Sequence, residues 1–252
     1  MTGKTECFAF IQVRNGSSRL PNKMSIPLVN GLTIPQLIVR RLKAELQGVT
    51  PVILTSSSPI DDSLEELAAR ESVKCFRGNE EDVLDRFITA ADHFGAQHIL
   101  RICADNPFLS TFHLKELIST FNGDTMDYLS YSFPDGTPIM KSHIGLFAEI
   151  MTDDLLKSIA QKTVDPLYRE HVTNYIYSHR EEFDAQFLPV PKTVAERRDI
   201  RLTLDTAADM ETINSLLKLV SPSVEIKQLV SAIDARPEIL DSMKKEIASN
   251  SK

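Results

Sequence analysis

Short apolar runs alternate along the first half of the chain with longer segments in which apolar residues recur every three or four positions. The short runs are bounded by turn residues and are typical of buried strands, whereas the longer spacing is typical of amphipathic helices. The predicted strands cover residues 7–13, 51–55, 73–76, 97–103 and 126–132, and the predicted helices cover residues 34–46, 60–70, 80–94 and 111–121. This alternation predicts an α/β fold with a mostly parallel sheet and helices on both faces.

The pattern changes after a turn cluster at residues 134–138. The later predicted elements are an extended segment at 139–149, helices at 153–161, 166–180 and 207–219, strands at 187–190 and 200–204, and a helical tail at 225–248 that breaks at Pro237. We interpret residues 1–252 as a single domain. Within it, residues 134–195 are expected to form a small inserted or appended subdomain for acceptor binding or dimer contacts.

Composition excludes several classes of function. The net charge is −7, and without a broad basic face the chain is not expected to bind nucleic acid. Three cysteines lie far apart without metal-site spacing, which suits a reducing cytosol. The chain shows no signal-peptide pattern, and no apolar run approaches the ~20 residues needed to span a bilayer. We therefore expect a cytoplasmic protein without membrane or nucleic-acid partners.

A basic loop directly follows the first predicted strand, with the sequence Arg-Asn-Gly-Ser-Ser-Arg-Leu-Pro-Asn-Lys. Small residues let backbone N–H groups approach phosphate oxygens, and the Arg and Lys side chains offset the charge of a polyphosphate. The alternative is a basic turn that only precedes a helix. The candidate nucleotide-binding residues of this loop are Arg14, Asn15, Gly16, Ser17, Ser18, Arg19 and Lys23.

Two aspartates, Asp105 and Asp205, each follow a predicted strand. Each could simply cap a helix or shape a turn. Together with the basic loop they are better explained by a metal-bound nucleotide, because Mg²⁺ prefers one or two carboxylates completed by phosphates and water. Ligands of such sheets bind beyond the carboxyl ends of the strands. In this hypothesis Arg19, Lys23 and Asp105 are catalytic, and the two cations stabilise the departing pyrophosphate.

Two further segments are dense in charge. Asp82, Asp85 and Arg86 share one face of a predicted helix, although acids near a helix start are also common on a solvated surface. Residues 169–171, Arg-Glu-His, could bind a sugar or a carboxylate. His171 could act as a base near neutral pH, with a structural histidine as the more common alternative.

Six segments, in order, carry a family resemblance. They are Ile11-Gln12-Val13-Arg14 with Ser18-Arg19-Leu20-Pro21 and Lys23, the stretch 76–86, Arg101-Ile102 with Asp105 and Pro107, Pro134-Asp135-Gly136, the stretch 169–173, and the stretch 201–206. Over these segments the chain resembles the cytidylyltransferases that activate acidic sugars and related polysaccharide precursors as CMP-linked donors. It is most similar to the spore-coat-polysaccharide branch, which is related to the acylneuraminate and 3-deoxy-manno-octulosonate cytidylyltransferases.

The resemblance implies a Rossmann-like core of the nucleotide-diphospho-sugar transferase type, CTP as donor, Mg²⁺ as cofactor and a homodimer. It assigns the CTP phosphates to Arg14, Arg19 and Lys23 and the metal to Asp105 and Asp205. The further nucleotide-binding residues are Thr55, Ser56, Arg77, Asp82 and Arg101. The acceptor-binding residues are Asp85, Arg86, Asp135, Lys141, Arg169, Glu170, His171 and Arg201.

Two departures from the family pattern change what we expect. Asn22 stands where the family commonly has Gly before the loop lysine, which predicts a stiffer or differently shaped loop. Residues 137–141 replace an acidic and apolar run, and Lys141 would suit a carboxylate or phosphate on the acceptor.

The sequence therefore predicts a Mg²⁺-dependent cytidylyltransferase that transfers CMP from CTP to an acidic sugar or other anionic polysaccharide precursor and releases pyrophosphate. One alternative is a glycosyltransferase that uses a metal-bound nucleotide sugar, which would favour a tight Asp-x-Asp pair over a basic pyrophosphate loop. Another is a non-catalytic nucleotide-binding protein of a polysaccharide pathway, which would bind nucleotide without releasing pyrophosphate.

Overall fold

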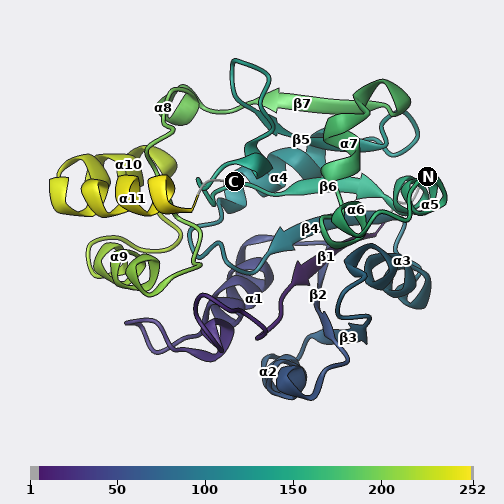
Figure 1. The fold of residues 1–252 in the computed structure, drawn as a ribbon, viewed down its shortest axis with the longest axis horizontal. Coiled ribbons are helices and arrows are strands. Elements are labelled where there is room, and N and C mark those ends of the chain that lie inside the picture. Colours follow the sequence, from purple (N-terminus) through teal and green to yellow (C-terminus); the bar gives the residue numbers. More distant parts are fainter. Residues whose placement is uncertain (1–5, 251–252) are drawn as a thin grey trace.

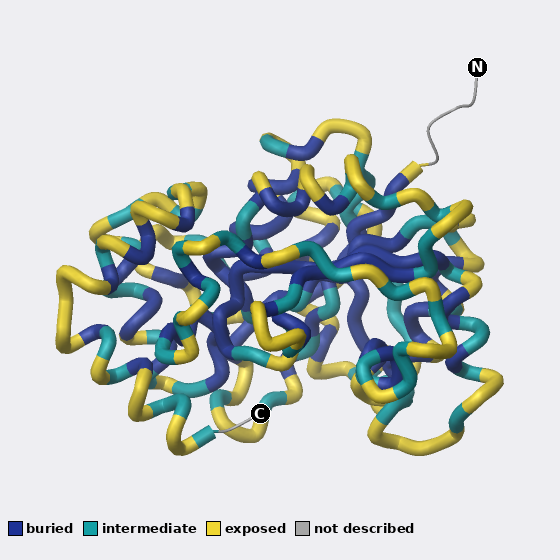
Figure 2. The backbone as a smooth tube through the Cα atoms, turned by 90° about the horizontal axis from the view of Figure 1, so that it is seen from above, coloured by how far each residue is buried: buried dark blue, intermediate teal, exposed yellow. Residues whose placement is uncertain are grey.

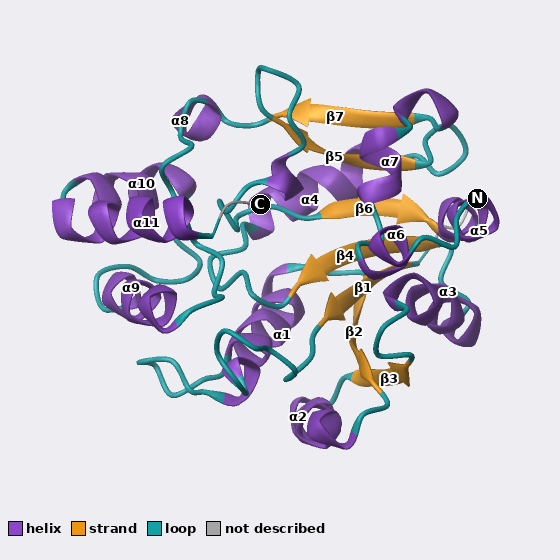
Figure 3. Cartoon of the chain, viewed as in Figure 1, coloured by secondary structure: helices purple, strands orange, loops and turns teal. Residues whose placement is uncertain are grey.

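The computed structural model describes residues 6–250, which form a seven-stranded sheet with helices on both faces (Figure 1, Figure 3). The strands are β1 (Cys7–Gln12), β2 (Val49–Ser56), β3 (Lys74–Gly78), β4 (His98–Cys103), β5 (Tyr128–Ser132), β6 (Glu149–Thr152) and β7 (Ala185–Pro189). Their order is β3-β2-β1-β4-β6-β5-β7, and β6 runs antiparallel to β4 and β5 while the other pairs are parallel. The predicted Rossmann-like, mostly parallel α/β fold is confirmed.

The helices carry capping residues at some of their ends. They are α1 (Ile34–Glu45), α2 (Asp62–Glu71), α3 (Val83–Phe94), α4 (Thr111–Thr120), α5 (Asp153–Lys162), α6 (Pro166–Glu170), α7 (Asn174–Ser178), α8 (Lys192–Ala195), α9 (Ala207–Leu217), α10 (Ile226–Asp234) and α11 (Pro237–Ser249). Thr33 and Gln36 form a capping box at the start of α1, and Asp82 caps α3 by accepting from Asp85 N. Gly95 ends α3 in the left-handed conformation at φ 67°.

The core lies on both faces of the sheet, and the inner strands β1, β4, β5 and β6 are almost entirely buried, whereas the edge strands β3 and β7 are not (Figure 2). Successive side chains of β1 point to opposite faces, as the period of a strand requires. Ala9 and Ile11 join the apolar cluster that contains α1, α2 and α4, whereas Phe8 and Phe10 join the cluster that contains α3, α5 and α7. Burial on both faces explains why the predicted strands are continuous apolar runs.

Residues 200–204 were predicted to be a strand, and this prediction is wrong. Leu202 N donates to His143 O and Leu204 N donates to Asp105 O, each at 2.9 Å. Alternate amides therefore bond to two different segments instead of to one neighbouring strand. The apolar residues of this stretch are buried as in a strand, which is why the pattern is misleading.

Two other predicted elements are also wrong. Residues 139–149 were expected to be extended, but they contain the 3-10 helix η3 (Ile139–Lys141) and an irregular segment that reaches β6 at Glu149. The predicted helix at 166–180 is broken into α6 and α7, followed by η4 (Arg180–Glu182). The 3-10 turn η1 (Lys23–Ser25) ends the basic loop, and η2 (Pro59–Asp61) precedes α2.

The segment between residues 134 and 195 contributes β6 and β7 to the main sheet. The structure therefore does not confirm a separate inserted subdomain, and a role of this segment in dimer contacts stays a prediction. None of the helices between residues 6 and 250 combines the length and the apolar character that crossing a bilayer requires.

The arrowheads of β4 and β7 point toward the side of the molecule where α9, α10 and α11 lie (Figure 1). Because β6 is antiparallel, its first residue, Glu149, pairs with Arg101 near the end of β4. Gly145, at φ 59°, lies where the segment before β6 meets residues 200–204, and a Cβ there would be 2.9 Å from Leu202 C. Residues from distant parts of the chain thus meet at one edge of the sheet.

Candidate active site

The basic loop, residues 14–23, is anchored by Asn15, which is 2% exposed. Its backbone N–H donates to Asp61 Oδ1 at 2.7 Å, and its side-chain amide donates to Ser63 Oγ at 3.1 Å. Asp61 is also buried and accepts from Ser56 Oγ at 2.5 Å. The Asn15 side chain therefore holds the loop against the turn after β2. Asn15 was predicted to bind nucleotide, and in the structure it anchors the loop.

Asn22 explains how the loop turns without the expected glycine. Its backbone lies in the left-handed region at φ 57° and ψ 24°. Glycine adopts this region most easily, and asparagine is among the residues that tolerate it best. Asn22 is thus compatible with a turn that favours glycine, and the turn directs Lys23 into the protein, where it is 9% exposed.

A cavity of about 370 Å³ opens between the basic loop, the carboxyl end of β4 and the start of α3. We call it the loop cavity. Its lining includes the predicted nucleotide-binding residues Arg14, Gly16, Ser17, Ser18, Arg19 and Lys23. It also includes Arg86, Asp105, Glu170, His171 and Asp205. Arg14 reaches Glu170 at 3.3 Å across its mouth. The lining thus holds four cationic side chains against three carboxylates, and this positive excess favours an anionic ligand.

Arg86 is the most deeply buried cation of the loop cavity, at 1% exposed. Its Nη1 donates to Asn79 O at 2.6 Å, and its Nε has no hydrogen-bond partner among residues 6–250. Burial, and then the like charge of Arg14, lower the pKa of Arg86 to about 10. Because a buried cation is costly without a bonded counter-ion, an anion in this cavity would be stabilised. Arg86 was predicted on the acceptor side, whereas the structure places it beside the basic loop.

Asp105 and Asp205 are brought together by the backbone hydrogen bond from Leu204 N to Asp105 O. Asp105 Oδ1 is buried and accepts no hydrogen bond from residues 6–250. Within those residues, no group of three or more His, Cys, Asp or Glu side chains could hold a metal ion. The unpartnered oxygen of Asp105, with a second carboxylate near it, fits Mg²⁺, which takes its other ligands from phosphates and water.

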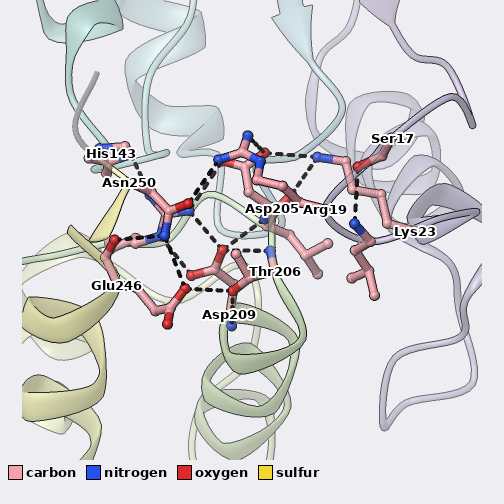
Figure 4. A network of polar contacts seen from close by, with 12 residues as sticks. Ser17, Arg19, Lys23, His143, Asp205, Thr206, Asp209, Glu246 and Asn250 are labelled. Carbon is pink, nitrogen blue, oxygen red and sulfur yellow. Dashed lines mark hydrogen bonds and ion pairs between the residues drawn. The ribbon is translucent and has the colours of Figure 1, made fainter. Parts of the chain in front are cut away.

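The Asp205 carboxylate is surrounded by cations (Figure 4). Its Oδ1 lies 2.9 Å from Lys23 Nζ and 3.1 Å from Arg19 Nη2, and its Oδ2 lies 3.2 Å from Arg201 Nη2. Burial alone would raise the pKa of Asp205, but Lys23, Arg19 and Arg201 outweigh burial and lower that pKa. Asp205 is therefore ionised, and a metal ion would share it with these cations.

A second cavity of about 590 Å³ begins where the loop cavity ends. We call it the η3 cavity, because η3, the segment before β6, and α7 form its walls. The residues that line both cavities are Arg19, Cys103, Asp105, His171 and Asp205. The site is thus divided into two compartments that meet at the two aspartates, which suits two ligands lying side by side.

Arg101 lines the η3 cavity but is committed to a buried partner. Its Nη1 donates to Glu149 Oε1, and its Nε donates to Gln12 Oε1 at 3.0 Å. Glu149 is 0% exposed and also accepts from Tyr177 OH at 2.8 Å and from Tyr128 OH. Arg101 was predicted to bind nucleotide, whereas its charge balances Glu149 within the wall of the other cavity.

Lys141 also lines the η3 cavity, with its ammonium 5.3 Å from the centroid of the Tyr177 ring. The other lysine or arginine residues of this lining, Arg19 and Arg101, pair with carboxylates. Within residues 6–250, no carboxylate lies within ion-pair distance of Lys141. Its charge is therefore available to an anionic group in the cavity.

Several predicted site residues lie outside the lining of both cavities, and nearby charges engage some of them. Arg77 pairs with Asp62 at 2.7 Å and Glu65 at 2.9 Å, and its Nε donates to Ser56 O at 3.0 Å. It therefore fixes the turn after β2. Thr55 and Ser56 are fully buried at the end of the same strand.

The predicted acceptor residues are similarly divided. Glu170 and His171 line a cavity, whereas Arg169 pairs with Asp82 at 2.5 Å. Asp135 pairs with Arg198 at 2.8 Å, and its bonds to Thr137 hold its pKa at about 2. Asp85 is exposed, and Arg201 is buried behind Asp205. The residues that the sequence analysis did not single out are Asp61, Glu149 and Tyr177. Of these, Glu149 could have been suspected, because a charge inside an apolar run is rarely buried without a partner.

The fold and the divided site define a nucleotidyltransferase with a Rossmann-like core. A model of the cytidylyltransferase family matches residues 8–235. The spore coat polysaccharide biosynthesis protein SpsF of Bacillus subtilis is 32% identical over 234 residues, covering 90% of this chain and 94% of that protein. The chain belongs to the cytidylyltransferase family and is an enzyme of that class.

Solved structures agree with this assignment. A cytidylyltransferase from Leptospira borgpetersenii superposes with a TM-score of 0.80 and 29% identity, covering 94% of this chain and 97% of that chain. A CMP:2-keto-3-deoxy-manno-octonic acid synthetase complexed with CTP gives a TM-score of 0.60 at 15% identity, covering 85% of this chain and 99% of that chain. The latter likeness is one of fold.

Proposed function

We propose that the enzyme transfers CMP from CTP to an anionic sugar or related polysaccharide precursor, with Mg²⁺ as cofactor. The observation that carries this proposal is the junction at Asp105 and Asp205 between a cationic cavity and a second cavity that contains Lys141. The family assignment and the CTP-bound structure of the same fold support CTP as the donor.

The loop cavity is the proposed site of the triphosphate. Arg14, Arg19, Lys23 and Arg86 supply charge, and the Gly16–Ser18 part of the loop supplies small residues that let the backbone approach phosphate oxygens. In the structure Lys23 and Arg19 contact Asp205, so phosphate oxygens would draw part of their charge away from that carboxylate.

Asp105 and Asp205 are the residues that would hold Mg²⁺. A bound Mg²⁺ would offset phosphate charge and make the α-phosphorus more electrophilic. The unpartnered Asp105 Oδ1 supports this assignment, because a cation would satisfy it.

In the proposed reaction, an oxygen of the acceptor forms a bond to the α-phosphorus of CTP. The bond from that phosphorus to the oxygen that bridges to the β-phosphate breaks, and pyrophosphate leaves with the electron pair. Arg19 and Lys23 would stabilise the charge on pyrophosphate. His171 lines both cavities and would accept the proton of an attacking hydroxyl. Positioning and electrostatics supply most of the catalysis in such transfers.

The first experiment is thermal-shift binding of CTP, UTP, ATP, GTP and a nucleotide sugar, each with and without Mg²⁺. The proposal expects stabilisation that is selective for CTP and enhanced by Mg²⁺. Preference for a nucleotide sugar over the triphosphates would overturn it in favour of a glycosyltransferase. Pyrophosphate release with a panel of sugar acids and sugar phosphates then tests turnover. Homodimer formation stays a prediction, which light scattering after size-exclusion chromatography tests.

A further inference from the structure

The last turn of α11, taken together with Asn250, the residue that caps this helix, lies outside the family match at residues 8–235, yet it reaches the active site (Figure 4). Arg19 Nη1 donates to Asn250 Oδ1 at 3.3 Å, while Arg19 Nη2 lies 3.1 Å from Asp205 Oδ1. The guanidinium is therefore held at two points, one on each side. Its side chain is otherwise 51% exposed, so these two contacts decide where it lies.

A second contact from the same turn supports the other side of the site. Thr206 Oγ1 donates to Glu246 Oε2 at 2.8 Å. Thr206 directly follows Asp205 and caps α9, since Asp209 N donates to Thr206 Oγ1 at 3.1 Å and Thr206 N donates to Asp209 Oδ2 at 2.9 Å. Glu246 thus fixes the hydroxyl of Thr206. Because Thr206 caps α9, this contact also positions the backbone beside Asp205.

The turn can act as a support because α11 is firmly packed. Met243 is 1% exposed and Ile239 is 7% exposed, both within the apolar core. Ser242 Oγ lies 3.2 Å from Thr212 Oγ1 on α9. Asn250 Nδ2 donates to Glu246 O at 3.1 Å, which links the two contact residues to each other.

We propose that the last turn of α11 positions the phosphate-binding groups of the active site, with Asn250 acting on Arg19 and Glu246 acting on Thr206 and hence on Asp205. This inference rests on the proposed function, because Arg19 has its role only if a polyphosphate binds there. A guanidinium has five N–H donors. Asn250 and Asp205 each contact one terminal nitrogen of Arg19, so the other N–H donors remain for phosphate oxygens. A side chain that is already held loses less conformational freedom when the ligand binds.

The experiment measures binding of pyrophosphate, CTP and CMP by calorimetry in the presence of Mg²⁺. Asn250→Ala is expected to weaken pyrophosphate and CTP about three- to tenfold, the usual effect of one hydrogen bond. CMP lacks the β- and γ-phosphates, so its affinity is expected to stay unchanged. Glu246→Ala removes the acceptor of the Thr206 hydroxyl and is expected to weaken CTP in the same range. Glu238→Ala, the same change on an exposed side chain at the start of α11, is the matched control and is expected to have no effect.

A double-variant cycle separates positioning from loss of structure. If Asn250 acts through Arg19, then adding Asn250→Ala to Arg19→Ala causes no further loss of pyrophosphate affinity. Equal losses for CMP and pyrophosphate, or a full additional loss in the Arg19→Ala background, would overturn the inference. Normal binding by Asn250→Ala and Glu246→Ala would overturn it while leaving the proposed function intact. Failure of the unaltered protein to bind CTP and pyrophosphate would overturn both.

Discussion

Lys23 Nζ lies 2.9 Å from Asp205 Oδ1, although 182 residues separate the two along the chain. Lys23 also donates to the carbonyl oxygen of Leu204 at 2.7 Å. This pair closes the basic loop onto the segment that carries the second aspartate. It is therefore a structural contact of the folded chain as well as a candidate part of the catalytic site.

The pair predicts how stability depends on pH. Because the cations lower the pKa of Asp205 in the folded protein, its contribution is present above the unfolded pKa of about 3.9 and is lost as pH falls through the lower folded value. Asp205→Asn is expected to cost about 3–5 kcal/mol at pH 7, since it leaves the buried ammonium of Lys23 without its carboxylate partner. Urea unfolding at several pH values checks this. The difference between the two proteins is expected to shrink below about pH 4, and a constant difference would contradict the prediction.

Asp105 is expected to matter for metal and little for folding. Its Oδ1 has no hydrogen-bond partner in the described part of the chain, so Asp105→Asn removes no hydrogen bond from that atom. We expect an unfolding midpoint close to that of the unaltered protein and CTP binding that no longer responds to Mg²⁺. Calorimetric titration with and without Mg²⁺ measures this. Asp154→Asn, on the exposed start of α5, is the control and is expected to keep the Mg²⁺ response.

A substitution at Gly78 tests the role of Arg86 in phosphate binding without removing the Arg86 charge. A Cβ at residue 78 would lie 2.8 Å from Arg86 Cγ, so Gly78→Ala must displace the Arg86 side chain. We expect CTP affinity to fall about tenfold, as a loss of about 1.4 kcal/mol at one phosphate contact would give. Gly48→Ala is the control, because its φ of 74° strains the backbone away from the site and nothing lies within 4 Å of its Cβ. Equal CTP affinity in both variants would argue against a phosphate role for Arg86.

Lys141 is expected to act on the acceptor alone. Lys141→Met keeps most of the side-chain stem over Tyr177 but removes the unpaired charge of the η3 cavity. KM for an anionic acceptor is expected to rise about tenfold, because one charge-assisted hydrogen bond is lost. KM for CTP is expected to stay unchanged. Steady-state pyrophosphate release measures both constants. Lys227→Met, on the exposed face of α10, serves as control. An unchanged acceptor KM would remove Lys141 from the binding site.

Much of the fold follows from local patterns. The strands up to β5 were predicted because each is a short continuous apolar run, and the helices that alternate with them because each has a periodic apolar face. Residues 200–204 were misread because burial alone produces the same apolar pattern when amides bond to two different segments. The break between α6 and α7 depends on how the chain packs. The periodicity of residues 166–180 carries no information about that packing.

The candidate site was predictable where the chain order itself brings residues to strand ends. The basic loop and Asp105 follow β1 and β4, which are neighbours in the sheet. In contrast, the partner of a charged residue is set by tertiary packing. Arg77 and Asp135 are engaged by Asp62 and Arg198. Sequence alone identifies such residues as charged, but it does not show that their charges are already neutralised.

The reversed direction of β6 separates two functions along the chain. Because β6 enters the sheet beside the end of β4, the irregular segment before it forms a wall of the η3 cavity and contributes nothing to the lining of the loop cavity. In the proposed function the η3 cavity holds the acceptor, so substitutions within residues 139–148 would change which acceptor is accepted while the proposed phosphate-binding residues stay the same. An enzyme built in this way can diversify its products over evolution and retain one donor chemistry.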